Sequence, residues 1–103
     1  MATANDQLQS GRKLALVIGN DTYTQPANRL KTSVANADQL SERLAKIGFE
    51  VAKHTDVRTE EFSNAFKTLR NSVQNDDTIL FYFSGHAYQV NNHNYLIPTD
   101  DHH

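Results

Sequence analysis

Cysteine is absent from all 103 residues of the sequence. This absence excludes disulfide bridges, thiolate metal ligands and any thiol nucleophile within the chain. Long apolar runs are missing as well, and no stretch approaches the roughly 18 residues that a membrane-spanning helix needs. We therefore expect no membrane partner.

The first eleven residues lack both the basic segment and the apolar segment of a secretory signal. Their polar composition predicts a disordered N-terminal lead over residues 1–11, with the folded domain occupying residues 12–103. Without a signal for export, we expect a cytoplasmic protein.

Charge of one sign is not concentrated anywhere in the chain. Ten basic residues face twelve acidic ones, the net charge is -2, and the basic residues cluster no further than Arg12 and Lys13. Nucleic-acid-binding domains carry a basic patch, so we expect no nucleic-acid partner. Hydrophobic residues at 38% and charged residues at 21% are typical of one small globular domain.

Three short apolar runs predict strands, at residues 14–18, 49–51 and 78–83. The first is continuous and suits a strand covered on both faces, whereas the second alternates with polar residues and suits a more exposed one. Pro26 and several turn-forming residues predict a loop over residues 23–32. After the third strand, residues 90–100 predict a hairpin around Asn91 and Asn92 followed by an extended arm.

Two segments show helical spacing of their apolar residues. The first begins at Ser33, a plausible N-cap, and its apolar positions are Val34, Ala37, Leu40, Leu44 and Ile47. The second follows a turn at residues 56–59, and its apolar positions are Phe62, Ala65, Phe66, Leu69 and Val73.

The resulting order βαβαβ predicts an α/β fold, in which right-handed crossovers place helices on both faces of a parallel sheet. Three strands are few for such a sheet, and an aromatic strand left at its edge invites association. We therefore expect a fourth strand, supplied either by sequence beyond His103 or by another chain.

Ser84, Gly85 and His86 follow the third strand directly. In open α/β sheets, ligands bind outside the carboxyl ends of the strands. Glycine there permits a sharp turn or a close approach, and histidine has a pKa suited to proton transfer near neutral pH. A histidine that merely hydrogen-bonds a loop is the alternative. Nearby polar residues that could line a site are Asn20, Asp21, Tyr23, Tyr88 and Gln89.

The ordered chain as a whole resembles the caspase-like cysteine peptidases (clan CD, family C14), especially their bacterial and metacaspase-type members. Four stretches carry the resemblance, in matching order and spacing: LALVIGNDTY, RLKTSVANADQLSERLAKIGFEV, DDTILFYFSGHAYQ and NHNYLIPTDD. They cover residues 12–101, which correspond to the N-terminal half of the catalytic domain, within its p20 region. The resemblance implies part of a three-layer caspase/haemoglobinase-like fold.

The resemblance also implies roles for individual residues. His86 corresponds to the general acid/base of a Cys-His pair, and Gly85 to the glycine that precedes it. Ser84 corresponds to a serine that lines the primary specificity pocket. The residue after the histidine is normally glycine, whose backbone N–H helps form an oxyanion hole. Here it is Ala87, which keeps the N–H but would be strained at positive φ.

Two further positions bear on substrate binding. Relatives that cleave after Arg or Lys carry Asn-Asp-Ala in the first helix, whereas this chain reads Asn36-Ala37-Asp38. The acidic residue, Asp38, has therefore moved by roughly 100° around the helix. Arg29 lies near the place where animal caspases hold an arginine that binds a substrate aspartate.

The nucleophile is the largest departure. Caspases carry their cysteine about 50 residues after the histidine, but only seventeen residues follow His86 here and none is cysteine. We expect the histidine-bearing part of a cysteine endopeptidase, truncated before its cysteine and inactive alone. If a C-terminal half completes the catalytic domain, we expect its substrate to be a peptide or protein.

The alternative is a non-catalytic pseudo-caspase module that associates with itself or a relative through its open sheet edge. Ala87 and the exchanged order of Ala37 and Asp38 favour this alternative. We expect neither a cofactor nor a metal, because the five histidines show no recognised ligand spacing. A flavodoxin-like or receiver-like domain has the same βαβαβ order. Such a domain would carry a carboxylate directly at the end of the third strand, where this chain has Ser84, Gly85 and His86 instead.

Overall fold

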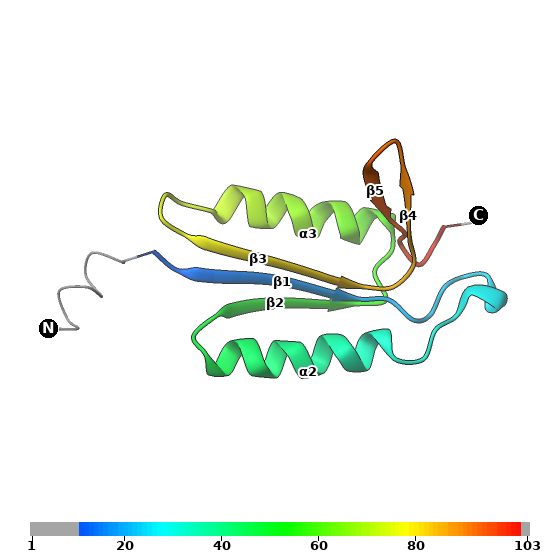
Figure 1. Cartoon of the computed structure of the whole chain (residues 1–103), viewed down its shortest axis with the longest axis horizontal. Helices are drawn as coiled ribbons and strands as arrows, with labels where there is room; N and C mark the ends of the chain where they lie inside the picture. The colour runs from blue at the N-terminus through cyan, green and yellow to red at the C-terminus, as the bar shows by residue number, and fades with distance from the viewer. Residues whose placement is uncertain (1–10, 102–103) are drawn as a thin grey trace, which may run out of the picture.

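A computed structural model describes residues 11–101 (Figure 1). The lead predicted for residues 1–11 therefore lies outside the described residues, apart from Gly11. Over the described part of the chain, no helix has both the length and the apolar character needed to cross a membrane.

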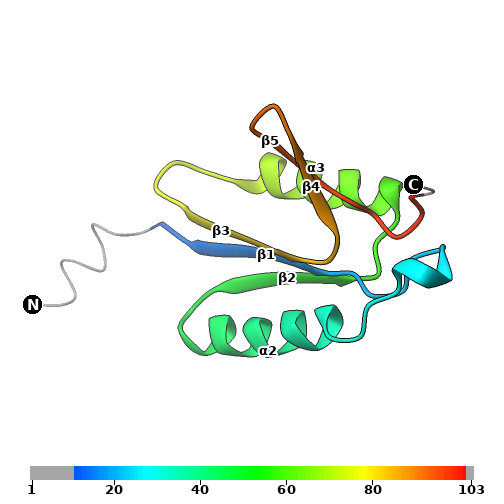
Figure 2. The same cartoon turned by 45° about the vertical axis from the view of Figure 1, so that its right-hand side comes forward.

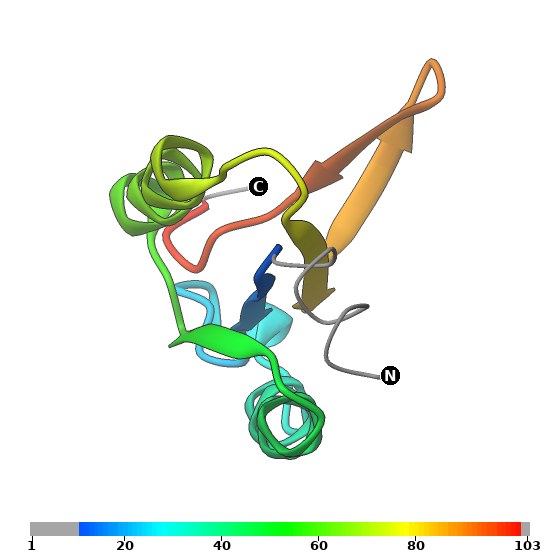
Figure 3. The ribbon, with the colours of Figure 1, turned by 90° about the vertical axis from the view of Figure 1, so that its left-hand side faces the viewer.

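Three parallel strands form the main sheet, in the order β2-β1-β3. They span Lys13–Gly19 (β1), Glu50–Thr55 (β2) and Thr78–Ser84 (β3). Helix α2 (Ser33–Lys46) lies on one face and helix α3 (Thr59–Ser72) on the other, as the end-on view shows (Figure 3). The prediction of an α/β fold with helices on both faces of a parallel sheet is confirmed.

The core consists of two clusters, one on each face of β1. Because successive strand residues point to opposite faces, Leu16 and Ile18 pack under α3 while Ala15 and Val17 pack under α2. A central strand covered on both sides must be apolar throughout, and residues Leu14 to Gly19 are indeed all buried.

Both helices form where their periodicity predicts, but their last apolar positions do not reach the core. Ile47 is 62% exposed and Val73 is 39% exposed, because each is the residue at which its helix ends and the chain turns away. The predicted N-cap at Ser33 is also wrong by one residue, since Thr32 occupies that position. Asp21 supplies the capping instead, because its carboxylate accepts hydrogen bonds from the N–H groups of Ser33 and Val34, at 2.8 and 3.0 Å.

The predicted hairpin is present, formed by β4 (Ala87–Val90) and β5 (His93–Leu96). Asn91 and Asn92 connect the strands with φ of 50° and 68°, as a two-residue type I′ turn requires. The hairpin stands away from the main sheet on the side of α3 (Figure 2). Its two strands therefore form a separate layer that begins directly after His86.

An ion pair closes the end of the sheet at which β1 begins. Arg12 Nη2 lies 2.8 Å from Asp77 Oδ2, and the Arg12 backbone N–H donates to Asp77 Oδ1 at 3.0 Å. The same guanidinium donates to the carbonyl of Ser72 at 2.6 Å. Arg12 thus joins the start of β1 to the end of α3 and the start of β3.

Asp77→Asn is expected to lower the melting temperature at neutral pH. Hydrogen bonding from Arg12 lowers the pKa of Asp77 from 3.8 to about 2 in the folded state. A folded pKa below the unfolded one stabilises the fold above about pH 4, and that stabilisation is lost as the pH falls towards 2. Thermal unfolding at pH 2–7 should therefore show a wild-type advantage that shrinks between pH 4 and 2. Glu42→Gln, at an exposed position on α2, serves as the control, and an advantage of D77N at pH 7 would contradict the assignment.

Candidate active site

The carboxyl ends of β1 and β3 and the segment after β5 are held together by one buried amide. Asn20 is fully buried, and its backbone N–H donates to the carbonyl of Ser84 at 2.8 Å. Its side chain accepts a hydrogen bond from the Val57 N–H at 2.9 Å and donates to the carbonyl of Ile97 at 3.4 Å. Asn20 therefore fixes the positions of the segments that surround His86.

The Tyr23 hydroxyl inserts between the two strands of the hairpin where they meet the sheet. It accepts a hydrogen bond from the His86 backbone N–H at 2.8 Å and donates to the carbonyl of Ile97 at 3.0 Å. The Ile97 N–H donates to the carbonyl of His86 at 3.0 Å. The hydroxyl thus takes the place of the second ladder bond that His86 and Ile97 would otherwise exchange. Burial raises the pKa of Tyr23, which keeps the hydroxyl protonated as a donor.

The imidazole of His86 is oriented by a backbone carbonyl. Its Nε2 lies 2.7 Å from the carbonyl oxygen of Asn28. A carbonyl oxygen only accepts hydrogen bonds, so Nε2 carries the proton and the neutral ring has its lone pair on Nδ1. The ring also packs edge-on against Tyr23, with centroids 4.8 Å apart. The neutral form of the His86 ring therefore has a defined tautomer.

A small cavity of about 160 Å³ lies beside the imidazole. The residues that line it are Tyr23, Asn28, His86, Ala87, Ile97 and Asp101. They come from the loop after β1, from the start of the hairpin and from the arm after it. The cavity is therefore formed where the ligand crevice of an open α/β sheet is expected.

The loop that presents the Asn28 carbonyl is itself braced. A short 3-10 helix, Pro26–Asn28, begins at a proline, whose fixed φ favours such a turn. The Leu30 N–H donates to the carbonyl of Asp21 at 2.9 Å, and Arg29 Nε donates to the carbonyl of Tyr23 at 3.0 Å. Arg29 is an exposed residue that here holds the loop; substrate binding by this residue stays a prediction.

Gly85 is required by packing. A Cβ at this position would lie 2.8 Å from the Tyr23 hydroxyl oxygen and 2.7 Å from the ring of Phe83. Real Cβ atoms do not approach this closely. Because Gly85 has no side chain, the Tyr23 hydroxyl can come close enough to accept the hydrogen bond from the His86 backbone N–H.

Ser84 and Ala87 flank this glycine-histidine pair. Ser84 is half-buried at the end of β3 and is not among the residues that line the cavity. Ala87 lines the cavity and is exposed. Its φ is not positive, so the alanine is tolerated without the strain that the sequence suggests. The roles of both residues in substrate binding and catalysis stay predictions.

Ala37 and Asp38 lie away from the cavity. Ala37 is fully buried in the core under α2. A Cβ on Gly19 would lie 2.8 Å from that of Ala37, so helix and strand are in close contact. Asp38 Oδ1 lies 2.6 Å from Lys53 Nζ of β2, and both side chains are partly exposed. The structure thus places Ala37 in the core and Asp38 in a surface ion pair at the β2 side.

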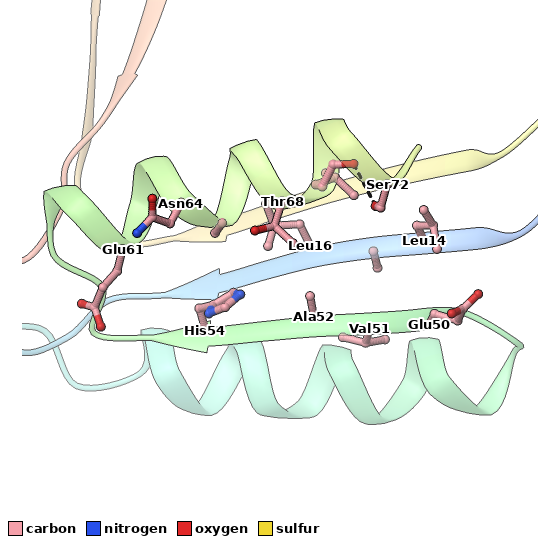
Figure 4. Close-up of a pocket in the computed structure, with 13 residues that line it drawn as sticks. Leu14, Leu16, Glu50, Val51, Ala52, His54, Glu61, Asn64, Thr68 and Ser72 are labelled. Atoms are coloured by element: carbon pink, nitrogen blue, oxygen red, sulfur yellow. Dashed lines mark hydrogen bonds between the residues drawn. The ribbon is translucent and has the colours of Figure 1, made fainter. Parts of the chain in front are cut away.

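A second hollow, of about 470 Å³, lies between α3 and the β1–β2 part of the sheet (Figure 4). The floor includes Leu14, Leu16 and Ala52, and polar side chains such as Glu61 and Glu50 stand at its ends (Figure 4). None of the predicted site residues lines it. Of the predicted site residues, His86 and Ala87 line the smaller cavity.

Residues 11–101 contain no group of three or more His, Asp or Glu side chains that could hold a metal ion. His102 and His103 lie outside the described residues.

Three positions that contact His86 or Ile97 are not identified by sequence reasoning alone. Asn20 and Tyr23 were expected only as possible lining residues, and Asn28 was not expected at all. All three act on His86 or Ile97 through contacts that span 58 to 77 positions of the chain. The available signal was their place in the loop after β1, at the carboxyl edge of the sheet.

A family model described as the caspase domain, Peptidase_C14, matches residues 12–103. No curated protein matches the chain.

Tyr23→Phe is expected to destabilise the fold by about 1–3 kcal/mol, because the partly buried His86 N–H loses its acceptor. Urea unfolding measures this loss, and amide hydrogen exchange at His86 should accelerate. Tyr88→Phe, at an exposed tyrosine of the hairpin, is the matched control and should cost less than about 0.5 kcal/mol. Equal effects of both substitutions would show that the Tyr23 hydroxyl does not hold the site.

Ala37→Asp should fail to create a site for basic substrates. The new carboxylate would be buried against β1 without a partner, which should cost at least about 3 kcal/mol of unfolding free energy. Asp38→Ala, which removes only an exposed ion pair, should cost about 1 kcal/mol or less. Chemical denaturation of both variants tests this difference, and a well-folded A37D protein would contradict the placement of Ala37 in the core.

Proposed function

The chain belongs to the caspase-domain family of peptidases, Peptidase_C14, and we propose that it is the histidine-bearing part of a cysteine-type endopeptidase in which His86 is the general acid/base. Peptide-bond hydrolysis is the activity of the family. The observation that carries the proposal is the 2.7 Å hydrogen bond between His86 Nε2 and the Asn28 carbonyl. It leaves Nδ1 as the nitrogen that exchanges protons.

The proposed chemistry uses both ring nitrogens. Nδ1 takes the proton of a neighbouring thiol, and the Asn28 carbonyl stabilises the imidazolium that forms, through Nε2–H. The thiolate then adds to the substrate carbonyl, and Nδ1–H returns its proton to the leaving amine as the C–N bond breaks. In the second half, Nδ1 accepts a proton from water, whose oxygen attacks the thioester, and the thiol is regenerated with that proton.

Because these 103 residues contain no cysteine, the thiol must come from another polypeptide segment. A strand added parallel to β3 would end at the same edge of the sheet as His86. A cysteine at the end of such a strand would meet the imidazole. This chain alone is therefore proposed to be inactive.

An oxyanion hole at Ala87 is supported by the register of the hairpin. Ala87 lies opposite Leu96, one position beyond the pair formed by His86 and Ile97. Because hydrogen-bonded and non-hydrogen-bonded pairs alternate, the Ala87 N–H points away from β5. It could thus donate to a substrate oxyanion beside the cavity. Ser84 and Arg29 are proposed to contact the substrate, whereas the ion pair with Lys53 does not support such a role for Asp38.

The second candidate function is a non-catalytic module that binds through the open edge of β3. Ala87 in place of glycine and the exposed side chains of Ile79 and Phe81 favour it. The two candidates differ in whether a cysteine ever reaches His86.

The test starts from the reading frame beyond the codon for His103. If it continues to a cysteine about 50 residues after His86, the encoded protein should hydrolyse peptides. In that protein His86→Ala should reduce kcat/KM about 10²- to 10⁴-fold. His93→Ala, at an exposed histidine of the hairpin, should leave the rate unchanged. The 103-residue chain itself should show no cysteine-peptidase activity on the same fluorogenic peptides.

An H86A protein with wild-type activity would refute the assignment of the base. A stop codon directly after His103, with no cysteine-bearing partner polypeptide, would favour the non-catalytic module.

A further inference from the structure

The outer edge of β3 presents unpaired backbone groups. Within residues 11–101, β3 pairs only with β1 and stands at the margin of the sheet (Figure 3). The Thr78 N–H donates to the Arg12 carbonyl and the Ser84 carbonyl accepts from Asn20, so these even-numbered residues face β1. Because the direction alternates along a strand, the N–H and C=O groups of Ile79, Phe81 and Phe83 point to the free edge.

The two edges of the sheet differ in their protection against pairing. Edge strand β2 carries Glu50 and Lys53, and charged side chains are a common means of preventing edge-to-edge association. Strand β3, with the sequence TILFYFS, has neither a charge nor a proline. Its Ile79 and Phe81 side chains are 41% and 39% exposed. The edge at β3 is therefore the one open to another strand.

We infer that, in the chain alone, a second copy occupies this edge, pairing antiparallel through β3 with a two-fold axis at Phe81. The strand is self-complementary about this residue. Ile79 lies opposite the partner's Phe83, Leu80 lies opposite the partner's Tyr82, and Phe81 lies opposite its own counterpart.

Both the hydrogen bonds and the side chains fit this register. Every outward-pointing residue of one copy meets an outward-pointing residue of the other, which gives three hydrogen-bonded pairs and six backbone bonds. The cross-strand pairs are aromatic or aliphatic, and such pairs stabilise antiparallel strands. The result is a closed, isologous six-stranded sheet with a protected β2 at each end.

The paired strands bring no like charges together, because TILFYFS carries no charged residue. Thr78 lies opposite the partner's Ser84, so the turn that contains Asp76 lies beside the partner's Gly85 and His86. Self-pairing also competes with a thiol-bearing strand for the same edge, so it corresponds to an inactive form. The inference itself does not depend on the peptidase proposal.

Sedimentation of the full chain at about 100 µM should show a dimer. Ile79→Lys should convert the dimer to monomer with an unchanged circular dichroism spectrum, because it places a charge at the edge. Ala52→Lys, at an exposed position of β2, is the matched control and should remain a dimer. A monomeric wild-type chain, or an I79K protein that remains a dimer, would overturn the inference, as would open-ended oligomers.

The register is tested by single cysteines, for which the cysteine-free chain has no background. At Phe81 the two Cα atoms should lie about 5.5 Å apart, within the range of a disulfide. At Ile79 the two copies should be separated by about 13 Å, which is four strand positions. Mild oxidation should therefore link Phe81→Cys at least ten-fold more than Ile79→Cys or Ala52→Cys.

The Phe81 ring packs on Phe66, with centroids 4.9 Å apart, so Phe81→Cys also removes a packing contact. A second variant tests the register with that contact in place. In T78C/S84C each cysteine lies opposite its complement in the other copy, and this protein should form a doubly linked dimer. Equal linking at positions 79 and 81, or no linking in T78C/S84C, would contradict the register.

Discussion

The hydroxyl group of Tyr23 determines how the histidine end of the sheet is built. It receives the His86 N–H and donates to the Ile97 carbonyl, so it opens the hairpin ladder at the point where the imidazole emerges. Gly85 must lack a side chain because this hydroxyl occupies the space. Asn20 holds the surrounding segments in place, and the Asn28 carbonyl fixes the ring. A shift of Tyr23 would therefore change the position of His86.

Local patterns were sufficient to predict most of the fold. The apolar run of β1, the helical spacing of α2 and α3, and Asn91-Asn92 in the hairpin each encode structure within a few residues. Helical spacing does not show which apolar positions reach the core, since Ile47 and Val73, at the ends of α2 and α3, are exposed.

The site was predictable only in part, because its contacts join residues far apart in the chain. The place of Gly85 and His86 after an apolar strand marks them as candidates, and the resemblance to caspase-like peptidases implies their roles. The bonds that Asn20, Tyr23 and Asn28 make to His86 or Ile97 span 58 to 77 positions, and spacing along the sequence carries no signal for them. Ala37 shows the same limit, since its burial against Gly19 depends on how closely α2 approaches β1.

The most direct test of the central claim is the tautomer of His86, read from long-range ¹H–¹⁵N correlations of the histidine rings across a pH titration. The account predicts that neutral His86 carries its proton on Nε2, donated to the Asn28 carbonyl, and presents an unprotonated Nδ1. A neutral ring protonated on Nδ1 would contradict it, because Nε2 could not then donate to Asn28 and the nitrogen assigned to proton transfer would already be occupied.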